Sequence, residues 1–318
     1  PYRPRSALCF PPRVISGFSR YAEQKMILQL LIDGEIDMIM STYRLRSRDV
    51  KFNDLGLLVV DEEQRFGVKH KEKIKRFRAA VDVLTLSATP IPRTLHMSLM
   101  GIRDLSLVNT PPADRRAIRT RLLPVNDYII QESVSREIRR GGQVFVVHNR
   151  VETIYEYGRY LESILPNIRI AIAHGQMREQ LLEKVMLDYI EGRFDVLLST
   201  TIIESGLDIP RANTIIINNA QNFGLSQLYQ LRGRVGRSDV QAYAYLLVPA
   251  EKILSGVAHE RIQVLQDLND LGAGFKVASR DLEIRGAGNL LGSEQSGQIA
   301  SVGLELYTGL LNTADAAY

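Results

Sequence analysis

Short apolar runs that end in small hydroxyl residues recur along the chain. A continuous apolar run of this length, followed at once by Ser or Thr, is typical of a buried parallel strand that meets a loop at its carboxyl end. Three runs have this shape: IDMIMSTY at 36–43, VDVLTLSATP at 81–90 and FDVLLSTT at 194–201. Further strands are indicated by LGLLVVD at 55–61, GQVFVVHN at 142–149 and NTIIIN at 213–218.

Helical patterns lie between these strands. YAEQKMILQLLIDG at 21–34 and REQLLEKVMLDYIEG at 178–192 repeat apolar residues at helical spacing, and each pattern ends at a glycine. Because strand and helix alternate, the pattern predicts the α/β class with parallel sheets. In such sheets ligands bind at the carboxyl ends of the strands, so the residues that follow each strand are the candidates for function.

The pattern also predicts how the chain divides. Two adjacent prolines and a cluster of charges interrupt it in VNTPPADRRAIRT, and a chain of 318 residues is long enough for two domains. We therefore expect a first domain at 1–107, a linker at 108–124 and a second domain at 125–249. The last part, 250–318, is expected to form a helical hairpin followed by a glycine-rich loop.

Composition changes the picture in two ways. The single cysteine, Cys9, excludes a disulfide within the chain and favours the cytoplasm, and no apolar run approaches the roughly 20 residues of a membrane helix. We therefore expect no membrane partner. Of the 40 basic residues, 31 are arginines, whose planar forks match phosphate oxygens. Composition alone leaves two explanations open: a phosphate-bearing partner, or a bias of the genome.

Three carboxylates follow the strand LLVV directly: Asp61, Glu62 and Glu63. Carboxylates at the end of a strand can hold Mg²⁺, and a neighbouring carboxylate can orient a water molecule that attacks a phosphate. Taken alone, the same cluster also fits a solvated turn.

Three arginines, Arg232, Arg234 and Arg237, lie within six residues in QLYQLRGRVGR at 227–237. Glycines separate them, and a glycine lets the backbone approach a ligand closely. Following a second strand-rich domain, this block is interpreted as arginine fingers that reach a γ-phosphate in a cleft between domains. Isolated surface arginines more often form only a solvated face.

Four segments occur in an order that resembles the superfamily 2 helicases and translocases. They are DEEQ at 61–64 (motif II), SAT at 87–89 (motif III), TTIIESGLDIP at 200–210 (motif V) and QLYQLRGRVGR (motif VI). ATPIPRTL at 88–95 and the tail RDLEIRGAGNLLGSEQSG at 280–297 resemble the RecG-like branch, in which the tail is called the TRG motif. FGVKHKEKIK at 66–75 and GIRDLSLVNTPPADRRAIRT at 101–120 resemble the bacterial transcription-repair coupling factors, with RecG as the runner-up.

The resemblance implies two RecA-like domains that use ATP and Mg²⁺. Asp61 would hold the Mg²⁺ ion, Glu62 would position the attacking water, and Arg234 and Arg237 would stabilise charge on the γ-phosphate. Glu63 and Gln64 would be structural or coupling residues. Residues at the nucleotide cleft would be Gly206, Asp208 and Gln230.

The resemblance also implies double-stranded DNA as the track, held at its phosphates without reading of sequence. The candidates for contact are Thr42, Arg44, Arg150, His174, Gly175, Thr200 and Thr201. Ser87 and Thr89 would couple hydrolysis to movement. Arg285 is expected in a glycine-rich loop, where it would reach the duplex or the motor core, or form a salt bridge that stabilises the loop.

One element of the family pattern is missing. A P-loop, G-x-x-x-x-G-K-[ST], should precede motif II, and the sequence contains no Gly-Lys pair. We therefore expect a fragment that begins inside the first motor domain and is inactive alone. The parent would move along DNA to displace RNA polymerase stalled at lesions, and further modules would bind the polymerase and a nucleotide-excision-repair protein. Two alternatives stay open: a RecG-like branch-migration helicase, and a shortened paralogue that binds DNA without hydrolysis.

Overall fold

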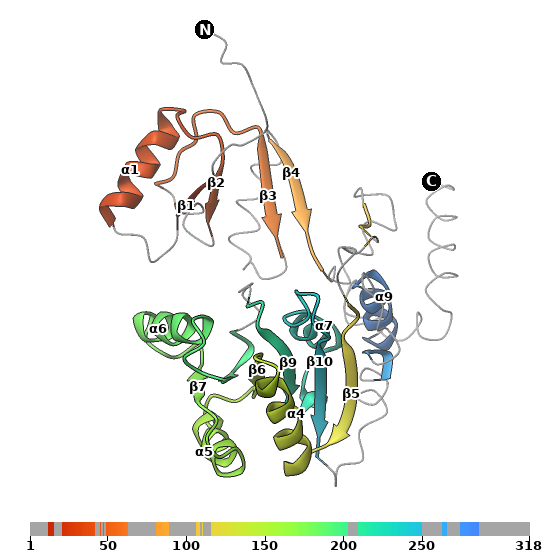
Figure 1. Cartoon of the computed structure of the whole chain (residues 1–318). Coiled ribbons are helices and arrows are strands. Elements are labelled where there is room, and N and C mark those ends of the chain that lie inside the picture. The colour runs from red at the N-terminus through yellow and green to blue at the C-terminus, as the bar shows by residue number, and fades with distance from the viewer. Residues whose placement is uncertain are drawn as a thin grey trace, which may run out of the picture. The chain divides into compact units, whose positions relative to one another are not determined.

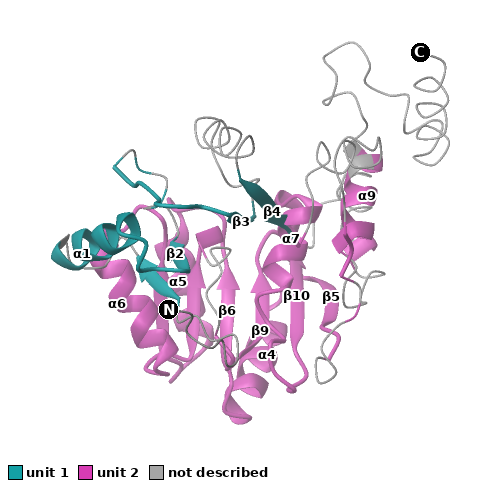
Figure 2. Cartoon of the chain, turned by 90° about the horizontal axis from the view of Figure 1, so that it is seen from above, with its two compact units in different colours: residues 1–87 teal, residues 88–318 magenta. Residues whose placement is uncertain are grey.

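The structure is a computed structural model that forms two compact units, 1–87 and 88–318, coloured separately in Figure 2. Each unit is considered by itself. The residues described are 12–15, 21–41, 45, 47, 49–62, 81–88, 106–108, 110, 116–202, 209–249, 263–265 and 274–285.

The first unit contains two pairs of parallel strands and one described helix. Its elements are β1 (Arg13–Ile15), α1 (Tyr21–Ile32), β2 (Ile39–Ser41), β3 (Leu57–Asp61) and β4 (Asp82–Leu86). Strand β1 pairs with β2 and β3 pairs with β4, both in parallel. The strands predicted at 36–43, 55–61 and 81–90 are confirmed, and so is the helix that ends before Gly34, whose φ is +75°.

One face of the β3–β4 pair is apolar and open to solvent. Leu57 and Val59 on β3 are 56% and 51% exposed, and Leu84 and Leu86 on β4 are 50% and 46% exposed. Val60, which points to the other face, is only 5% exposed. Parallel sheets are normally covered on both faces, but no described element of this unit covers this face.

The second unit is built on a six-stranded parallel sheet in the order β5-β10-β9-β6-β8-β7 (Figure 1). Its strands are β5 (Arg119–Pro124), β6 (Gln143–Val147), β7 (Ile170–Ala173), β8 (Val196–Ser199), β9 (Ala212–Ile217) and β10 (Tyr243–Val248). The strands predicted at 142–149, 194–201 and 213–218 are confirmed as β6, β8 and β9. The α/β class is therefore confirmed.

Helices cover both faces of this sheet. On one face, α4 (Asp127–Arg139) and α5 (Ile154–Ile164) pack Ile130, Val134 and Leu161 against the strands. On the other, α6 (Glu179–Ile190), α7 (Leu225–Arg232) and α9 (Gly274–Arg285) contribute Tyr189, Leu228 and Val277. A short 3₁₀ helix, η4 (Ala220–Asn222), follows β9. Helix α6 confirms the pattern at 178–192, which ends at Gly192 with φ of +81°.

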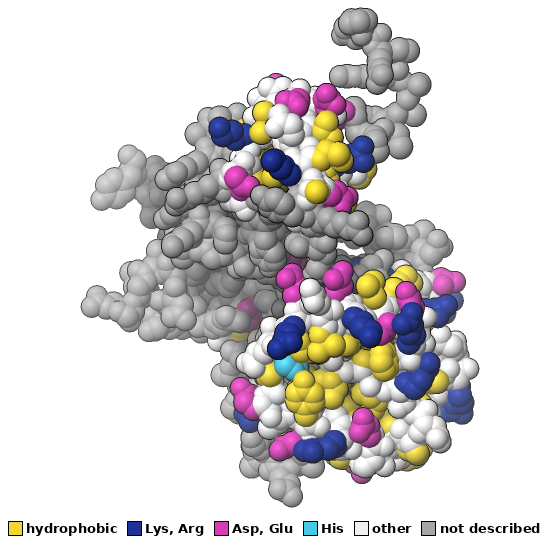
Figure 3. All heavy atoms as spheres, turned by 90° about the vertical axis from the view of Figure 1, so that its left-hand side faces the viewer, with side chains coloured by type: hydrophobic (Ala, Val, Ile, Leu, Met, Phe, Trp, Pro, Cys, Tyr) yellow, Lys and Arg dark blue, Asp and Glu magenta, His cyan; other side chains and the backbone are white. Residues whose placement is uncertain are grey.

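Apolar side chains also reach the surface beside α5 and α6. Tyr155 on α5 and Leu181 and Ile190 on α6 are 54%, 49% and 39% exposed. Figure 3 shows hydrophobic side chains gathered on this side of the molecule with lysines and arginines around them. None of the described helices is both long and apolar enough to span a bilayer.

Three segments differ from the sequence expectations. Strand β5 occupies the end of the range assigned to a linker and pairs with β10 along all of its six residues. Arg285 was expected in a loop, but it is the last residue of α9, because the apolar spacing of this segment continues a helix to that point. Of the helix expected at 259–274, residues 263–265 are helical, and the rest lies outside the described residues except Gly274, which begins α9.

Candidate functional site

The carboxyl edge of the β3–β4 pair brings together three of the predicted residues. Asp61 is the last residue of β3 and pairs in register with Leu86, the last residue of β4. The Glu62 N–H donates to the Leu86 carbonyl at 3.0 Å, and Ser87 follows directly. Adjacent parallel strands end at one edge, so Asp61, Glu62 and Ser87 lie at the same end of this sheet. Asp61 and Ser87 are exposed there.

Glu62 adopts a backbone conformation that is unusual for its type, with φ of +51°. This left-handed conformation costs a residue other than glycine about 1–3 kcal/mol and is concentrated at functional sites. The Glu62 side chain is half-buried.

The residues present fit a weakly held Mg²⁺ ion. The described parts of the chain contain no group of three or more His, Cys, Asp or Glu side chains able to hold a metal. Mg²⁺ commonly uses one or two carboxylates and takes its other ligands from water and phosphate oxygens. The exposed Asp61 carboxylate could serve as such a single protein ligand.

The predicted arginine block occupies the end of α7 and the turn after it. Arg232 is 4% exposed, its guanidinium donates to the Leu265 carbonyl at 3.0 Å, and it lies 4.9 Å from the centre of the Tyr229 ring. Burial lowers the pKa of Arg232. Arg234 is half-buried and Arg237 is exposed. The three arginines therefore divide into one that supports the fold and two that reach solvent.

The backbone conformation and packing at position 236 explain why it is a glycine, which the sequence did not indicate. Its φ is +72°, and a Cβ there would lie 3.0 Å from Ile118 and 3.1 Å from Ala242. The glycine was expected to let the backbone approach a ligand. The structure adds that this position packs against the segments leading into β5 and β10.

A row of polar residues marks the carboxyl edge of the six-stranded sheet. Val147 pairs with Ser199 on one side and Ile217 on the other, and Ala173 also pairs with Ser199. The residues that follow these strands therefore lie at one level of the sheet. In strand order they are Asn218, His148, Thr200 and His174.

His148 connects two of these strand ends. Its Nδ1 lies 3.0 Å from the Asn218 side-chain nitrogen, and its Nε2 lies 2.7 Å from Thr153 Oγ1. The ring stacks on Tyr157 with centroids 4.8 Å apart. Burial, followed by the charge of Arg150, lowers the pKa of His148, so the ring is held neutral at physiological pH.

A small pocket, most of whose lining residues are polar, opens beside His148. Its volume is about 130 Å³, and it is formed by the turns that follow β6 and β9. Asn219 shapes one of these turns with φ of +54°. Amides and a guanidinium are suited to phosphate and sugar oxygens. The lining residues are His148, Asn149, Arg150, Asn218, Asn219, Asn222 and Phe223.

The candidates on β7 and β8 are less accessible. Thr200 is 7% exposed and His174 is 6% exposed, and His174 Nε2 lies 3.0 Å from the Tyr155 hydroxyl. Thr201 is half-buried and Gly175 is exposed. At this end of the sheet the backbone at Gly175 is thus more open to a ligand than the threonine and histidine side chains.

The remaining predicted residues are placed only in part. Gln230 lies on α7 and is half-buried, and Arg150 is exposed at the pocket. Arg285 ends α9, with its side chain outside the described part. Thr42, Arg44, Glu63, Gln64, Thr89, Gly206 and Asp208 also lie outside the described residues.

Comparison with known proteins identifies relatives of the whole chain. Residues 125–239 match the model of the helicase conserved C-terminal domain. The chain is 55% identical over 303 residues to the transcription-repair-coupling factor of Myxococcus xanthus, and 55% identical over 301 residues to that of Haemophilus influenzae. Over 95% of its length, the chain is therefore similar to part of the transcription-repair-coupling factors. Each match covers 95% of this chain but only 25% and 26% of the relatives. This chain therefore spans about a quarter of their length.

Solved structures agree with this assignment. A structure of RecG bound to a three-way DNA junction matches 96% of this chain and 40% of the RecG chain, with a TM-score of 0.71 and 35% identity. Dbp5 of S. cerevisiae bound to RNA and ADP BeF3 matches 82% of this chain and 69% of the Dbp5 chain, with a TM-score of 0.60. At 17% identity this second likeness shows the fold alone. The predicted RecA-like fold and the resemblance to the coupling factors of the RecG-like branch are confirmed.

Sequence reasoning missed most of the pocket. His148, Asn149, Asn218 and Asn219 follow two runs that were recognised as strands, so the rule that ligands meet strand ends could have found them. The contact between α7 and α9 was also missed: Ser226 donates to the buried Asp281 carboxylate at 3.2 Å. No spacing in the sequence indicates that pair.

Proposed function

We propose that this chain is the motor segment of a transcription-repair coupling factor, which hydrolyses ATP to move along double-stranded DNA. The observation that carries the proposal is the position of Asp61 and Glu62 at the carboxyl end of a parallel strand, beside Ser87. Carboxylates at this position can serve a metal-bound triphosphate. The 55% identity to coupling factors supports the same reading.

The two carboxylates would have different roles. Asp61, which is exposed at the strand end, would hold the Mg²⁺ ion that neutralises phosphate charge when ATP is bound. Glu62 would orient the attacking water. Arg234 and Arg237 would stabilise the charge that develops on the γ-phosphate, since both reach solvent from the turn after α7. Gly206, Asp208 and Gln230 would contact the nucleotide.

DNA would be held at the carboxyl edge of the six-stranded sheet. Arg150 and the asparagines of the pocket offer donors to phosphate oxygens, and Gly175 offers exposed backbone. Thr42, Arg44, Thr200, Thr201 and His174 would complete the track. Contacts of this kind carry little sequence information and weaken steeply as salt rises.

Movement would depend on α9. This helix packs against α7, which carries Gln230 and Arg232, and the Ser226–Asp281 hydrogen bond joins the two helices. A shift of α7 on hydrolysis would therefore be felt at Arg285, at the far end of α9. Ser87 and Thr89 would couple hydrolysis to movement in the first unit.

In a longer protein this motor would displace RNA polymerase stalled at lesions in the cytoplasm. The polymerase and a nucleotide-excision-repair protein would bind modules outside this chain, as the name of the relatives suggests. A second candidate is branch migration, because the RecG structure that resembles this chain is bound to a three-way DNA junction. A DNA-binding paralogue without hydrolysis is the third.

The test compares two proteins, this chain and a full-length coupling factor that contains it. The 318-residue chain should show no ATP turnover above background, because it contains no P-loop to hold the β- and γ-phosphates. The full-length factor should turn over ATP faster with duplex DNA present. Arg150→Glu in that factor should weaken duplex binding and reduce its salt dependence, whereas the exposed Arg159 on α5 provides a control reversal. Turnover by the short chain alone would refute the assignment.

A further inference from the structure

A strongly basic surface lies on the face of the sheet that α4 covers, away from the polar row at the carboxyl edge. Arg119 and Arg121 on β5 pair in register with Tyr243 and Tyr245 on β10. Paired residues of adjacent parallel strands point to the same face. Tyr245 belongs to the core beneath α4, so both arginines point to the α4 side of the sheet.

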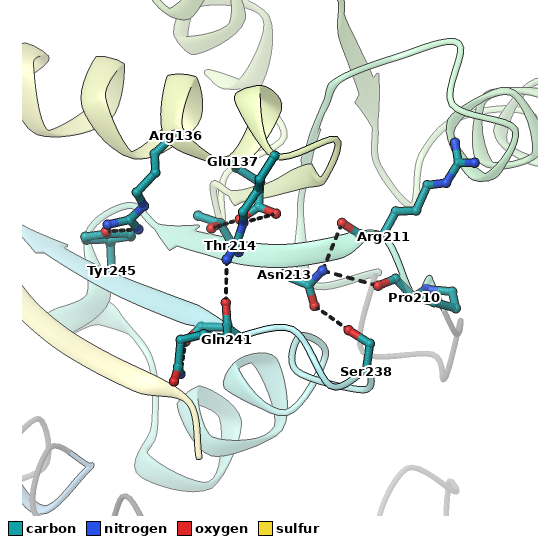
Figure 4. A network of polar contacts seen from close by, with 11 residues as sticks. Arg136, Glu137, Pro210, Arg211, Asn213, Thr214, Ser238, Gln241 and Tyr245 are labelled. Carbon is teal, nitrogen blue, oxygen red and sulfur yellow. Dashed lines mark hydrogen bonds and ion pairs between the residues drawn. The ribbon is translucent and has the colours of Figure 1, made fainter. Parts of the chain in front are cut away.

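Helix α4 adds arginines to the same surface. The Arg136 guanidinium lies 3.8 Å from the centre of the Tyr243 ring and donates to the Tyr245 hydroxyl at 2.6 Å (Figure 4 shows Arg136 over Tyr245). Arg140 lies 5.5 Å from the Tyr243 ring. We call Arg119, Arg121, Arg136 and Arg140 the arginine surface.

One carboxylate balances this charge. Glu137 is fully buried and accepts from Arg140 and from Thr214. Within the described chain no ion pair joins Arg119, Arg121 or Arg136 to an acid, although Glu132 is exposed on α4 and Asp239 is exposed in the segment before β10. The arginine surface therefore carries a large uncompensated positive charge.

Among the described strands, β5 has one unpaired backbone edge beside these arginines. Strand β5 is at the edge of the sheet, and β10 is its partner among the described strands. The N–H groups of Arg119 and Val125 donate to the carbonyls of Ala242, just before β10, and Val248, at its end, at 3.0 and 2.9 Å. Because successive residues of a strand point to opposite sides, Thr120 and Leu122 direct their N–H and C=O groups outward. Such an edge is a template for another strand.

We propose that an acidic, extended segment of a partner protein adds to β5 as a further strand and pairs its carboxylates with the arginine surface. Arg119 and Arg121 stand two residues apart, about 6.6 Å, which matches alternate side chains of an extended peptide. Stacked Tyr and Arg side chains are favoured at protein interfaces. The sugar-phosphate backbone of nucleic acid has no row of N–H groups to pair with the outward carbonyls of β5. The proposed DNA track lies at the carboxyl ends of the strands, not along this lateral edge.

Binding to the full 318-residue chain is measured with a fluorescent peptide of alternating glutamate and valine. The double variant R119E/R121E should weaken binding at least about tenfold, which corresponds to about 1.4 kcal/mol. R159E/K184E reverses two exposed charges on α5 and α6 and should leave binding unchanged. R119Q/R121Q, which adds no repulsion, should give an intermediate loss, and melting temperatures check that each variant is folded.

A second measurement separates strand addition from simple charge attraction. Thr120→Pro removes one outward N–H while the bonds to β10 remain, and proline is tolerated on edge strands at such positions. It should weaken peptide binding, whereas Thr120→Val should not. Amide hydrogen exchange of Thr120 and Leu122 should slow when the peptide is bound.

Three results would overturn the proposal. The first is equal binding of the peptide to wild type and R119E/R121E. The second is unchanged exchange at Thr120 and Leu122 under saturating peptide. The third is that a proline-rich peptide of the same charge, or a short DNA duplex, binds the arginine surface as tightly and is insensitive to Thr120→Pro, since this would identify a general anion surface.

Discussion

Nδ1 of His148 lies 3.0 Å from the side-chain nitrogen of Asn218 and joins the ends of β6 and β9. An amide nitrogen only donates, so Nδ1 must accept, and the proton of the neutral ring lies on Nε2, where it is donated to Thr153 Oγ1 at 2.7 Å. The ring therefore holds two turns of the polar pocket in place while it is neutral. A second proton would break the bond to Asn218.

The first prediction follows from this bond. Burial lowers the pKa of His148 from its usual 6.5, so the unfolded chain binds a proton more readily than the folded one. Stability from this residue is present above pH 6.5 and is lost as pH falls below it. An NMR titration of the imidazole should give a pKa below 6.5. Protonation at a higher pH would show that the ring is not held neutral.

A matched variant checks the same point through stability. His148→Gln should lower the free energy of unfolding by about 1–3 kcal/mol at neutral pH, because a buried amide loses its acceptor. The variant should also lose the part of the acid sensitivity that His148 supplies. Melting temperatures between pH 5 and pH 8, a window of about 1.5 units on each side of 6.5, measure both effects.

Gly236 provides the second prediction. Gly236→Ala should destabilise the chain by about 1–3 kcal/mol, because an alanine would be strained at φ of +72° and its Cβ would press on Ile118 and Ala242. Gly233→Ala is the control. Gly233 is in the right-handed region with φ of −68°, and its nearest atoms would lie 3.5 Å away. Equal melting temperatures of the two variants would contradict the account.

The third prediction separates two arginines of one motif. Arg232→Ala should lower the melting temperature, because it leaves the Leu265 carbonyl without its buried donor. Arg237→Ala should leave the melting temperature unchanged, since Arg237 is exposed, but should reduce ATP turnover of the full-length factor by about 10³-fold. A stable, fully active Arg237→Ala variant would remove Arg237 from the catalytic set.

The sequence predicted β6, β8 and β9 because these strands are buried on both faces, but β10, which is also central and buried, was not predicted. Strands β6, β8 and β9 are continuous apolar runs, as full burial in a parallel sheet requires. Strand β5, with two exposed arginines and a proline, lacks that pattern because it lies at the edge. Its pairing with β10 joins residues more than a hundred positions apart, which no local pattern indicates.

The candidate site also contains residues that the sequence could identify and residues whose roles it could not separate. Asp61 and Glu62 could be chosen because DEEQ stands in order before three further segments that resemble helicase motifs, and the structure places both residues at the strand end. Arg232 could not be separated from Arg234 and Arg237 by spacing. Its partner, the Leu265 carbonyl, comes from a distant segment and decides its role.

The fourth prediction concerns α9. In the full-length factor, Arg285→Ala should leave ATP turnover largely intact but abolish displacement of a triplex strand, because loss of one charge-assisted contact, about 1.5–3 kcal/mol, is enough to uncouple movement. Arg280→Ala is the control on the same helix, since Arg280 is exposed and pairs with Glu283 at 2.7 Å. If Arg285→Ala lowers the melting temperature and turnover together, Arg285 supports the helix end instead.

The measurement that tests the central claim most directly is triplex displacement by the full-length factor and its Glu62→Gln variant. The wild type should displace the triplex strand only with ATP. The variant keeps the shape of the side chain but cannot orient the water, so turnover should fall by about 10²-fold or more and displacement should stop, while ATP-dependent DNA binding persists. Displacement by the variant at the wild-type rate would contradict the assignment of Glu62 and the motor function built on it.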